Sequence, residues 1–534
     1  MFAPRRFSFS LPLSGRALAC LCLIYVLAGL TGHDPWKTDD ALNFGITYTA
    51  LADGRWLLPH LAGENLFHTP PLYHWLAAAC AWIFAGLLPT HDAVRLATGI
   101  FAAAFLAFLV LAGRRLHGRE AGDAAALVAI GCLGLLVPMH ETQPQIALLA
   151  ACAAFYAGLA RMPLQPLAGG TEAGLALGTA FLAGGAPALL YLLPLPLLLP
   201  AHGDWRRAGR LRAFALLLLL ATSCAALWPL LLYSQHPAAL AAWWSQFGLQ
   251  VQSKAWAWLP AQAELLSWFA WPALPLAAWS IWLQRRELMA AKPFLLLLGS
   301  GTSLLVLLLF FEPRPLAALP LLVPLILLAT SAAGQLRRGA ANAFDWFGMM
   351  TFTLVAGLLW LGGFALDMGL PPRVANNFAR LQPGFVGQGT AVAWGLAFLF
   401  SLAWIGMIVA HPRSPWRALT HWAAGVTLAW VLAVIFMLPW VDYGKSYRTV
   451  AVSLKRALPL PHQCIAERRL GTSQRISLDY FAGIKTRRGA AAAACDLLLE
   501  QGGGGTMPTG WEMIWEGSRP GDRSERLRLY RRGY

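Results

Sequence analysis

The chain has 534 residues, of which 58% are apolar and only 12% are charged, and its formal net charge is +16. Soluble domains carry about 25% charged residues, so this composition, with its repeated apolar runs of about 20 residues, argues against a soluble protein and predicts a polytopic α-helical membrane protein. The positive charge does not indicate nucleic-acid binding, because the arginines form short clusters between apolar runs, where cytoplasmic loops carry them.

The chain begins with a basic segment that leads into an apolar run from Leu18 to Leu30. No small-x-small cleavage site follows this run, so we predict an uncleaved first span rather than a signal peptide.

Residues 33–92 form the longest polar and aromatic stretch between apolar runs, and we expect the chemistry there. Within it, residues 38–53 predict a helix that Thr38 caps and that Asp53-Gly54 ends. Asp39 and Asp40 then lie in the first turn, where the helix dipole favours negative charge.

The apolar runs predict the membrane topology. The run 173–201 is interrupted at 184–187, which predicts two short helices that meet at a turn. The run 72–88 is assigned to the interface, because only then do all the arginine clusters fall on the cytoplasmic side. We therefore expect about thirteen spans, with the N-terminus inside and the C-terminus outside. The remaining runs are 17–32, 92–112, 122–138, 144–160, 211–233, 264–284, 293–311, 315–333, 347–368, 389–410 and 418–440.

The last part of the chain is its one polar domain. We divide the protein into a transmembrane domain at 1–440, with the first external loop at 33–92, and a small soluble α/β domain at 441–534. Short strands are expected at 464–468, 495–501, 511–517 and 525–532, with a helix between Cys464 and Cys495. These two cysteines are either disulfide-bonded or free, and the alternatives stay open at this point.

Two kinds of acidic group are candidates for chemistry. Asp39 and Asp40 either serve as helix-start charges or hold a carboxylate at the water–lipid boundary, where it can orient or deprotonate an attacking hydroxyl. Glu141 lies in a second external turn beside a histidine.

The first loop also carries polar and aromatic candidates that either line a site or are simply solvated. These are His60, His68 and Tyr73. A divalent metal ion is an open possibility, with His68 and Glu141 as its candidate ligands.

External cations are the third group. Arg314, Lys445 and Arg448 fall at the predicted outer boundary, against the positive-inside trend, and can bind a donor phosphate. Arg95 and Lys254 are further candidates. The alternative for each is snorkelling to lipid headgroups.

The sequence resembles the GT-C glycosyltransferases, and within them the lipid A aminoarabinose transferases, with the protein O-mannosyltransferases further off. The resemblance rests on Asp39-Asp40, on the segments 52–59 and 67–75, and on the segment from Phe310 through Arg314 to Pro320. It implies about thirteen spans, two juxtamembrane helices in the first loop, an external C-terminal domain, and Asp39 as the catalytic aspartate.

The chain also departs from that pattern. His68-Thr69 stands where the family has Glu-Lys, Gly184-Gly185 where it has a Lys-Gly turn, and 143–145 where it usually has an aspartate. For this reason we do not carry over the aminoarabinose or the lipid A specificity.

Two hypotheses follow. The first is an inner-membrane glycosyltransferase that moves a sugar, with inversion, from a polyprenyl-phosphate donor to a lipid or other envelope acceptor at the periplasmic face. The second is a non-catalytic or transport relative that binds polyprenyl-linked lipids.

Overall fold

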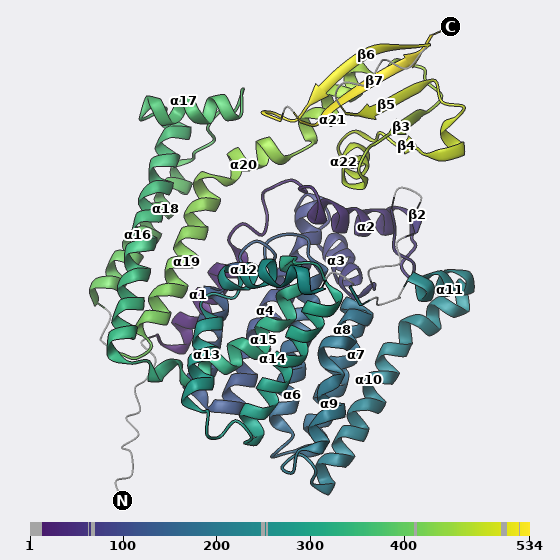
Figure 1. Cartoon of the computed structure of the whole chain (residues 1–534). Helices are drawn as coiled ribbons and strands as arrows, with labels where there is room; N and C mark the ends of the chain where they lie inside the picture. The colour runs from purple at the N-terminus through teal and green to yellow at the C-terminus, as the bar shows by residue number, and fades with distance from the viewer. Residues whose placement is uncertain are drawn as a thin grey trace, which may run out of the picture.

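The computed structural model describes residues 13–61, 64–65, 70–246, 251–252, 255–410, 414–502, 510–522 and 524–533. A body of helices forms most of the molecule, and a small sheet domain lies at one end of it (Figure 1). This is the predicted fold class, a helical membrane protein with a C-terminal α/β unit.

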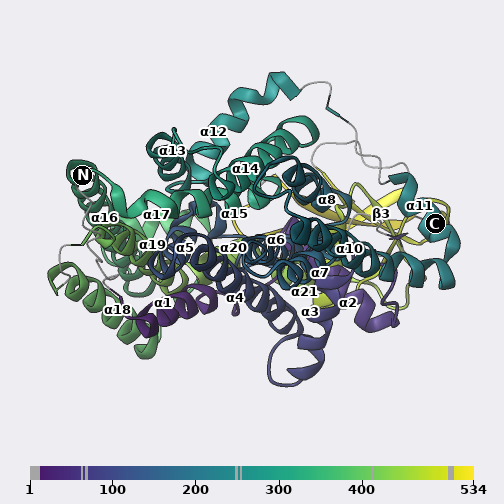
Figure 2. The same cartoon turned by 90° about the horizontal axis from the view of Figure 1, so that it is seen from below.

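The helical body is built from long apolar helices. In Figure 2, α16, α18 and α19 lie beside α1 on one side, α4, α5, α6 and α15 lie in the middle, and α7, α8 and α10 lie on the other side. Their bounds are α1 Gly15–Leu27, α4 Thr90–His117, α5 Arg119–Gly131, α6 Pro144–Arg161, α7 Pro166–Gly184, α8 Ala186–Leu192, α9 Pro194–Leu198, α10 Ala208–Gln235, α11 Pro237–Gln246, α12 Leu259–Phe269, α13 Ala273–Leu283, α14 Ala291–Phe310, α15 Pro315–Ala332, α16 Arg338–Met368, α17 Pro372–Leu381, α18 Ala391–Ala410 and α19 Arg417–Phe436.

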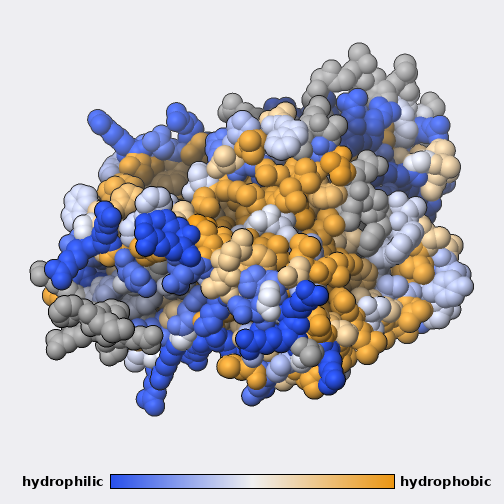
Figure 3. Space-filling model, turned by 60° about the horizontal axis from the view of Figure 1, so that its bottom comes forward, coloured by the Kyte–Doolittle hydropathy of each residue, from blue (hydrophilic) through white to orange (hydrophobic). Residues whose placement is uncertain are grey.

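Among the described residues, seven helices are long and apolar enough to cross a membrane, and five shorter apolar helical segments accompany them. Large apolar side chains are exposed along these helices, and Figure 3 shows a broad apolar surface over the helical body. Such a surface fits contact with lipid. Examples are Leu219, Leu230, Leu354, Leu358, Leu399, Ile405 and Val409.

Small residues let neighbouring helices approach closely. A Cβ atom added at Gly170 of α7 would lie 2.5 Å from the carbonyl oxygen of Ala213 in α10, and one added at Gly158 of α6 would lie 2.5 Å from the backbone nitrogen of Ala173 in α7. Without a hydrophobic effect between helices in lipid, this close packing is a main source of their association.

Two apolar runs are interrupted. The run 173–201 breaks at Gly185, which has a φ of +67°, and α7 meets α8 there as expected. The run 264–284 was predicted as one span, and this prediction is wrong. It forms α12 and α13, which are separated at Pro272, since proline lacks the N–H that a continuous helix requires.

The loop at 33–92 forms α2 (Asp39–Asp53), β1 (His60–Leu61), β2 (Glu64–Asn65) and α3 (Leu72–Ile83). Gly54, at φ +69°, ends α2 as predicted, but the Thr38 side chain makes no capping hydrogen bond. With 12 residues, α3 is too short to cross a membrane. Figure 1 places α2, α3, α11 and α17 at the end of the body that carries the sheet domain.

The C-terminal unit contains the four predicted strands and the predicted helix, together with one short strand that the sequence did not indicate, β4. Five strands form one sheet in the order β4-β3-β5-β7-β6, in which β3 runs parallel to β4 and β5 while the other pairs are antiparallel. A disulfide joins Cys464 to Cys495. The elements are α20 Leu438–Lys445, α21 Arg448–Ala457, β3 Ile465–Arg468, α22 Thr472–Ala482, β4 Thr486–Arg487, β5 Leu497–Gln501, β6 Trp511–Ser518 and β7 Arg526–Arg532.

Candidate active site

The adjacent aspartates at the start of α2 face different surroundings. Asp39 is exposed, and its carboxylate makes no hydrogen bond or ion pair with the part of the chain that the structure describes. Asp40 is almost completely buried. Successive side chains on a helix point about 100° apart, so a helix that packs one of the two inward turns the other toward solvent.

Asp40 anchors the segment that precedes α2. Its carboxylate accepts hydrogen bonds from the backbone N–H groups of Trp36 at 2.9 Å and Thr142 at 2.7 Å, and from the guanidinium of Arg95 at 3.2 Å. Burial acts to raise the pKa of Asp40, but Arg95 and the other donors outweigh it and hold the pKa below its usual value. These three donors occupy the carboxylate oxygens of Asp40, so its role is to position the segment before α2.

Arg95, at the start of α4, is the cation at the centre of this cluster. It is fully buried, and it also donates to the carbonyl of His33 at 3.1 Å and to Asp92 at 3.1 Å. It is therefore not available to a donor phosphate, against the sequence-based suggestion. Asp92 in turn accepts from the backbone N–H of Gly32 at 3.0 Å.

A second cluster joins the same segment to the C-terminal domain. Asp34 forms an ion pair with Arg448 and accepts a hydrogen bond of 2.5 Å from Ser446. Asp442 accepts from the backbone N–H of Asp34 at 2.9 Å and from the indole N–H of Trp36 at 2.7 Å. These contacts join residues about 400 positions apart and fix the C-terminal domain over the first loop.

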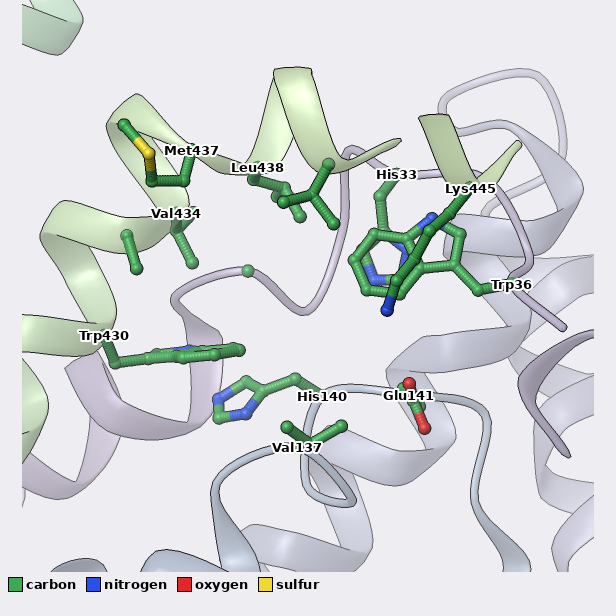
Figure 4. A pocket seen from close by; sticks show the side chains of 13 residues that line it. His33, Trp36, Val137, His140, Glu141, Trp430, Val434, Met437, Leu438 and Lys445 are labelled. Atoms are coloured by element: carbon green, nitrogen blue, oxygen red, sulfur yellow. The ribbon is translucent and has the colours of Figure 1, made fainter. Parts of the chain in front are cut away.

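A cavity of about 180 Å³ opens beside these two clusters. One end has an apolar wall that includes Trp430 and Val434 of α19, and the other end carries Glu141 and Lys445 (Figure 4). The ammonium group of Lys445 lies 4.4 Å from the ring centroid of Trp36, a cation–π contact. The cavity thus joins an apolar surface to a charged end, and at this volume it suits the charged head of a lipid together with the start of its apolar tail.

The charged end of the cavity holds an acid with an altered pKa. Burial, together with the negative charges of Asp40 and Asp39, raises the pKa of Glu141 to about 7, and Lys445 opposes this rise. Asp39 does not line the cavity, but it begins α2 only three residues after Trp36, which does. A carboxyl group with a pKa near neutrality is suited to proton transfer.

The three predicted phosphate ligands have different surroundings. Lys445 lines the cavity, and Arg448 is about half exposed, with its guanidinium paired to Asp34 and 4.5 Å from the ring centroid of Phe481. Arg314 lies on the turn between α14 and α15, where it is 75% exposed and pairs with Glu312. It is not among the residues that line the cavity.

The other candidates of the first loop have structural contacts. The imidazole of His60 lies 2.9 Å from the carboxylate of Asp53, and the hydroxyl of Tyr73 lies 2.7 Å from that of Thr98 in the buried core. His68 lies outside the described residues. Within those that are described, no group of three or more His, Cys, Asp and Glu side chains could hold a metal ion.

Sequence reasoning did not single out several residues that build this site. Asp34, Trp36 and Asp442 tie the loop to α20, and Trp430 forms the apolar wall. Asp442 lies three residues before Lys445, and this closeness to a candidate cation is the one feature of the sequence that could have drawn attention to it. The contacts of Asp34, Trp36 and Trp430 are visible only in the tertiary structure.

Comparison with known proteins supports the resemblance. No family model matches the sequence. An undecaprenyl phosphate-α-4-amino-4-deoxy-L-arabinose arabinosyl transferase of Pseudomonas fluorescens is 27% identical over 423 residues, which are 75% of this chain and 67% of that protein. A transferase of the same name from Pseudomonas aeruginosa is 29% identical over 354 residues, and the match spans 62% of each protein, less than two thirds of that relative.

Solved structures show the same fold over nearly the whole chain. The crystal structure of ArnT from Cupriavidus metallidurans bound to undecaprenyl phosphate superimposes with a TM-score of 0.70 at 15% identity, and covers 96% of this chain and 97% of that one. The apo structure of the same protein gives a TM-score of 0.68. The chain is therefore similar in sequence to the undecaprenyl phosphate aminoarabinose transferases and has the fold of a GT-C glycosyltransferase.

Proposed function

We propose that this protein is a membrane glycosyltransferase that moves a sugar from a polyprenyl-phosphate donor to a lipid or other envelope acceptor. The observation that carries the proposal is the cavity described above, which joins an apolar wall to a charged end near the start of α2, in a chain with the fold of ArnT. An amphipathic cavity at the end of a helical body matches a donor with an apolar tail and an anionic head.

In this proposal the residues around the cavity divide the work. Lys445 and Arg448 bind the donor phosphate, and the apolar wall that includes Trp430 contacts the first part of the prenyl chain. Asp39 accepts the proton of the acceptor hydroxyl while the hydroxyl oxygen attacks the anomeric carbon of the donor sugar. The bond from that carbon to the phosphate oxygen breaks, and polyprenyl phosphate leaves with the bonding electrons, stabilised by the cations. A single displacement inverts the anomeric centre.

The buried carboxylate and the external arginine have separate places in this scheme. Asp40 acts as a positioning residue, because Arg95 and two backbone N–H groups occupy its oxygens. Arg314 is a contact for the donor or for headgroup phosphates from the exposed turn. The donor belongs to the polyprenyl-phosphate class, and its sugar is left unassigned because the first-loop motif departs from the family pattern at 68–69.

We further propose that the protein lies in the inner membrane with its N-terminus in the cytoplasm and its C-terminal domain in the periplasm. The arginine clusters between apolar runs support this orientation. The disulfide of the C-terminal domain supports it as well, because disulfides persist in oxidising compartments.

The test is turnover of purified Asp39→Asn with a lipid-linked sugar donor. Loss of a general base lowers the rate by about 10²- to 10⁴-fold, while the control Glu512→Gln, an exposed carboxylate on β6, retains full activity. Undiminished turnover in Asp39→Asn would remove Asp39 from the mechanism.

A second experiment separates transfer from transport. Mass spectrometry of envelope glycolipids after deletion of the gene is expected to show a missing sugar. Unchanged glycans with an altered lipid distribution would instead support a transport relative.

A further inference from the structure

A second cavity, of about 230 Å³, lies between the first loop and the C-terminal domain. Figure 1 shows α22 lying over α2, and the cavity is formed where the C-terminal part of α2 and β1 meet α22 and β4. Asp53, at the far end of α2 from Asp39, lines it. Fourteen residues of helix span about 21 Å, so this cavity is separate from the one near the start of α2.

The walls of this second cavity carry charges of both signs. Asp53 and Asp479 supply two carboxylates, and Lys485 and Arg475 supply two cations. Burial raises the pKa of Asp479, the positive charge of Lys485 opposes this rise, and the negative charge of Asp53 adds to it. The three groups therefore act on one another across the cavity. Because the charges balance, the cavity offers no strong net attraction to an anion or to a cation.

Two of these groups remain available to a ligand. Asp479 and Lys485 line the same cavity, yet within the described chain neither side chain forms a hydrogen bond or an ion pair. By contrast, Arg475 is buried and held by Thr486 at 3.2 Å and Glu64 at 3.3 Å. Beside the fixed side chain of Arg475, the cavity therefore presents one hydrogen-bond acceptor, Asp479, and one hydrogen-bond donor, Lys485, that are not paired with each other.

An aromatic ring completes the lining. Tyr48 packs against Phe44 and Tyr480, with ring centroids 5.8 and 5.3 Å apart. Pockets that enclose drug-sized ligands measure about 300–1,000 Å³, so a cavity of this size suits a smaller ligand, such as one six-membered ring.

We propose that this cavity binds one neutral sugar ring of the acceptor. Hydroxyl groups both donate and accept hydrogen bonds, so they match a wall that presents Asp479 as acceptor and Lys485 as donor. Neither a phosphate nor an amine is favoured, because two carboxylates and two cations line the same cavity. That the sugar belongs to the acceptor rests on the proposed transferase function, whereas the binding of a sugar does not.

The test is saturation-transfer NMR on the full chain, purified in a detergent without sugar groups, with methyl β-D-glucopyranoside and N-acetylglucosamine as probes. Asp479→Ala and Lys485→Met are each expected to weaken binding at least tenfold. The two variants are tested separately, and thermal unfolding in detergent checks that each is folded. The matched control Glu512→Gln changes a carboxylate of the same domain outside the cavity and is expected to leave binding unchanged.

A further variant separates the two proposals. Asp39→Asn is expected to lose transfer and to keep its sugar binding, whereas the two cavity variants are expected to raise the KM for the acceptor with less effect on kcat. Saturation transfer that is absent, or equal in the wild type and both cavity variants, would overturn the sugar site. Binding of inorganic phosphate in place of either sugar, measured by ³¹P NMR, would overturn it as well.

Discussion

Replacement of Arg95 by methionine is expected to destabilise the protein strongly. Arg95 is fully buried and donates hydrogen bonds to the carboxylates of Asp40 and Asp92 and to the carbonyl of His33. Methionine has a similar length but supplies no donor, so two buried carboxylates remain without their cation. Removal of one partner from a buried ion pair costs about 3–5 kcal/mol, and we expect about 4 kcal/mol here.

The assay is the unfolding of the purified protein in detergent by heat or denaturant. The matched control is Arg526→Gln, because Arg526 pairs with Glu516 at the surface with 48% of its side chain exposed. Exposed pairs contribute about 0–1 kcal/mol, so this variant is expected to unfold almost as the wild type does.

A second substitution tests whether the loss comes from an uncompensated charge. Addition of Asp40→Asn to Arg95→Met removes one of the two stranded carboxylates and is expected to recover part of the stability. A free energy of unfolding for Arg95→Met within about 1 kcal/mol of the wild type, or a double variant no more stable than Arg95→Met alone, would contradict the role of Arg95 as the cation that compensates these carboxylates.

Three further outcomes are expected. Burial raises the pKa of Glu141 from 4.5 to about 7, so between these pH values the folded protein keeps a proton that the unfolded chain releases. The free energy of unfolding is therefore expected to fall by about 3 kcal/mol as the pH rises through this window. Unfolding curves measured at about pH 4.5 and about pH 8 should show that Glu141→Gln has lost this pH dependence. Cys464 and Cys495 close a loop of 31 residues, so replacement of both by serine should cost about 3.5 kcal/mol, seen as faster proteolysis of the C-terminal domain. Arg314→Gln should leave the unfolding curve unchanged, because the ion pair of Arg314 with Glu312 is exposed. If Arg314 contacts the donor phosphate, this variant should raise the KM for the donor about tenfold. An unchanged KM would assign Arg314 to contact with lipid headgroups.

Local patterns were enough to predict most elements of the fold. The strands β3, β5, β6 and β7 coincide with short segments in which apolar and polar residues alternate or in which polar residues bound an apolar run. The helix α22 lies where the helix was expected. The end of α2 was predicted because glycine at position 54 readily adopts the positive φ that terminates a helix. The break between α12 and α13 at Pro272 was not predicted, because the run 264–284 is predominantly apolar and was therefore predicted as one span.

The candidate site was predicted only in part, because its contacts are distant in sequence. Asp34 binds Arg448, more than 400 residues away, and Trp36 binds Asp442. No periodicity or motif specifies such a pair, since it depends on how the C-terminal domain docks on the first loop. Glu141 and Lys445 were both recognised as external charges, but only the fold shows that they line one cavity.

By itself, the sequence determined that this is a helical membrane protein with an acidic doublet in the loop at 33–92, because composition, apolar run length and helix-terminal residues are local properties. The tertiary structure decided which member of the doublet is buried. Asp39 and Asp40 are chemically identical, and a helix necessarily points them in different directions. Only the packing of α2 against α4 and the turn at Thr142 turned Asp40 toward Arg95 and left Asp39 exposed.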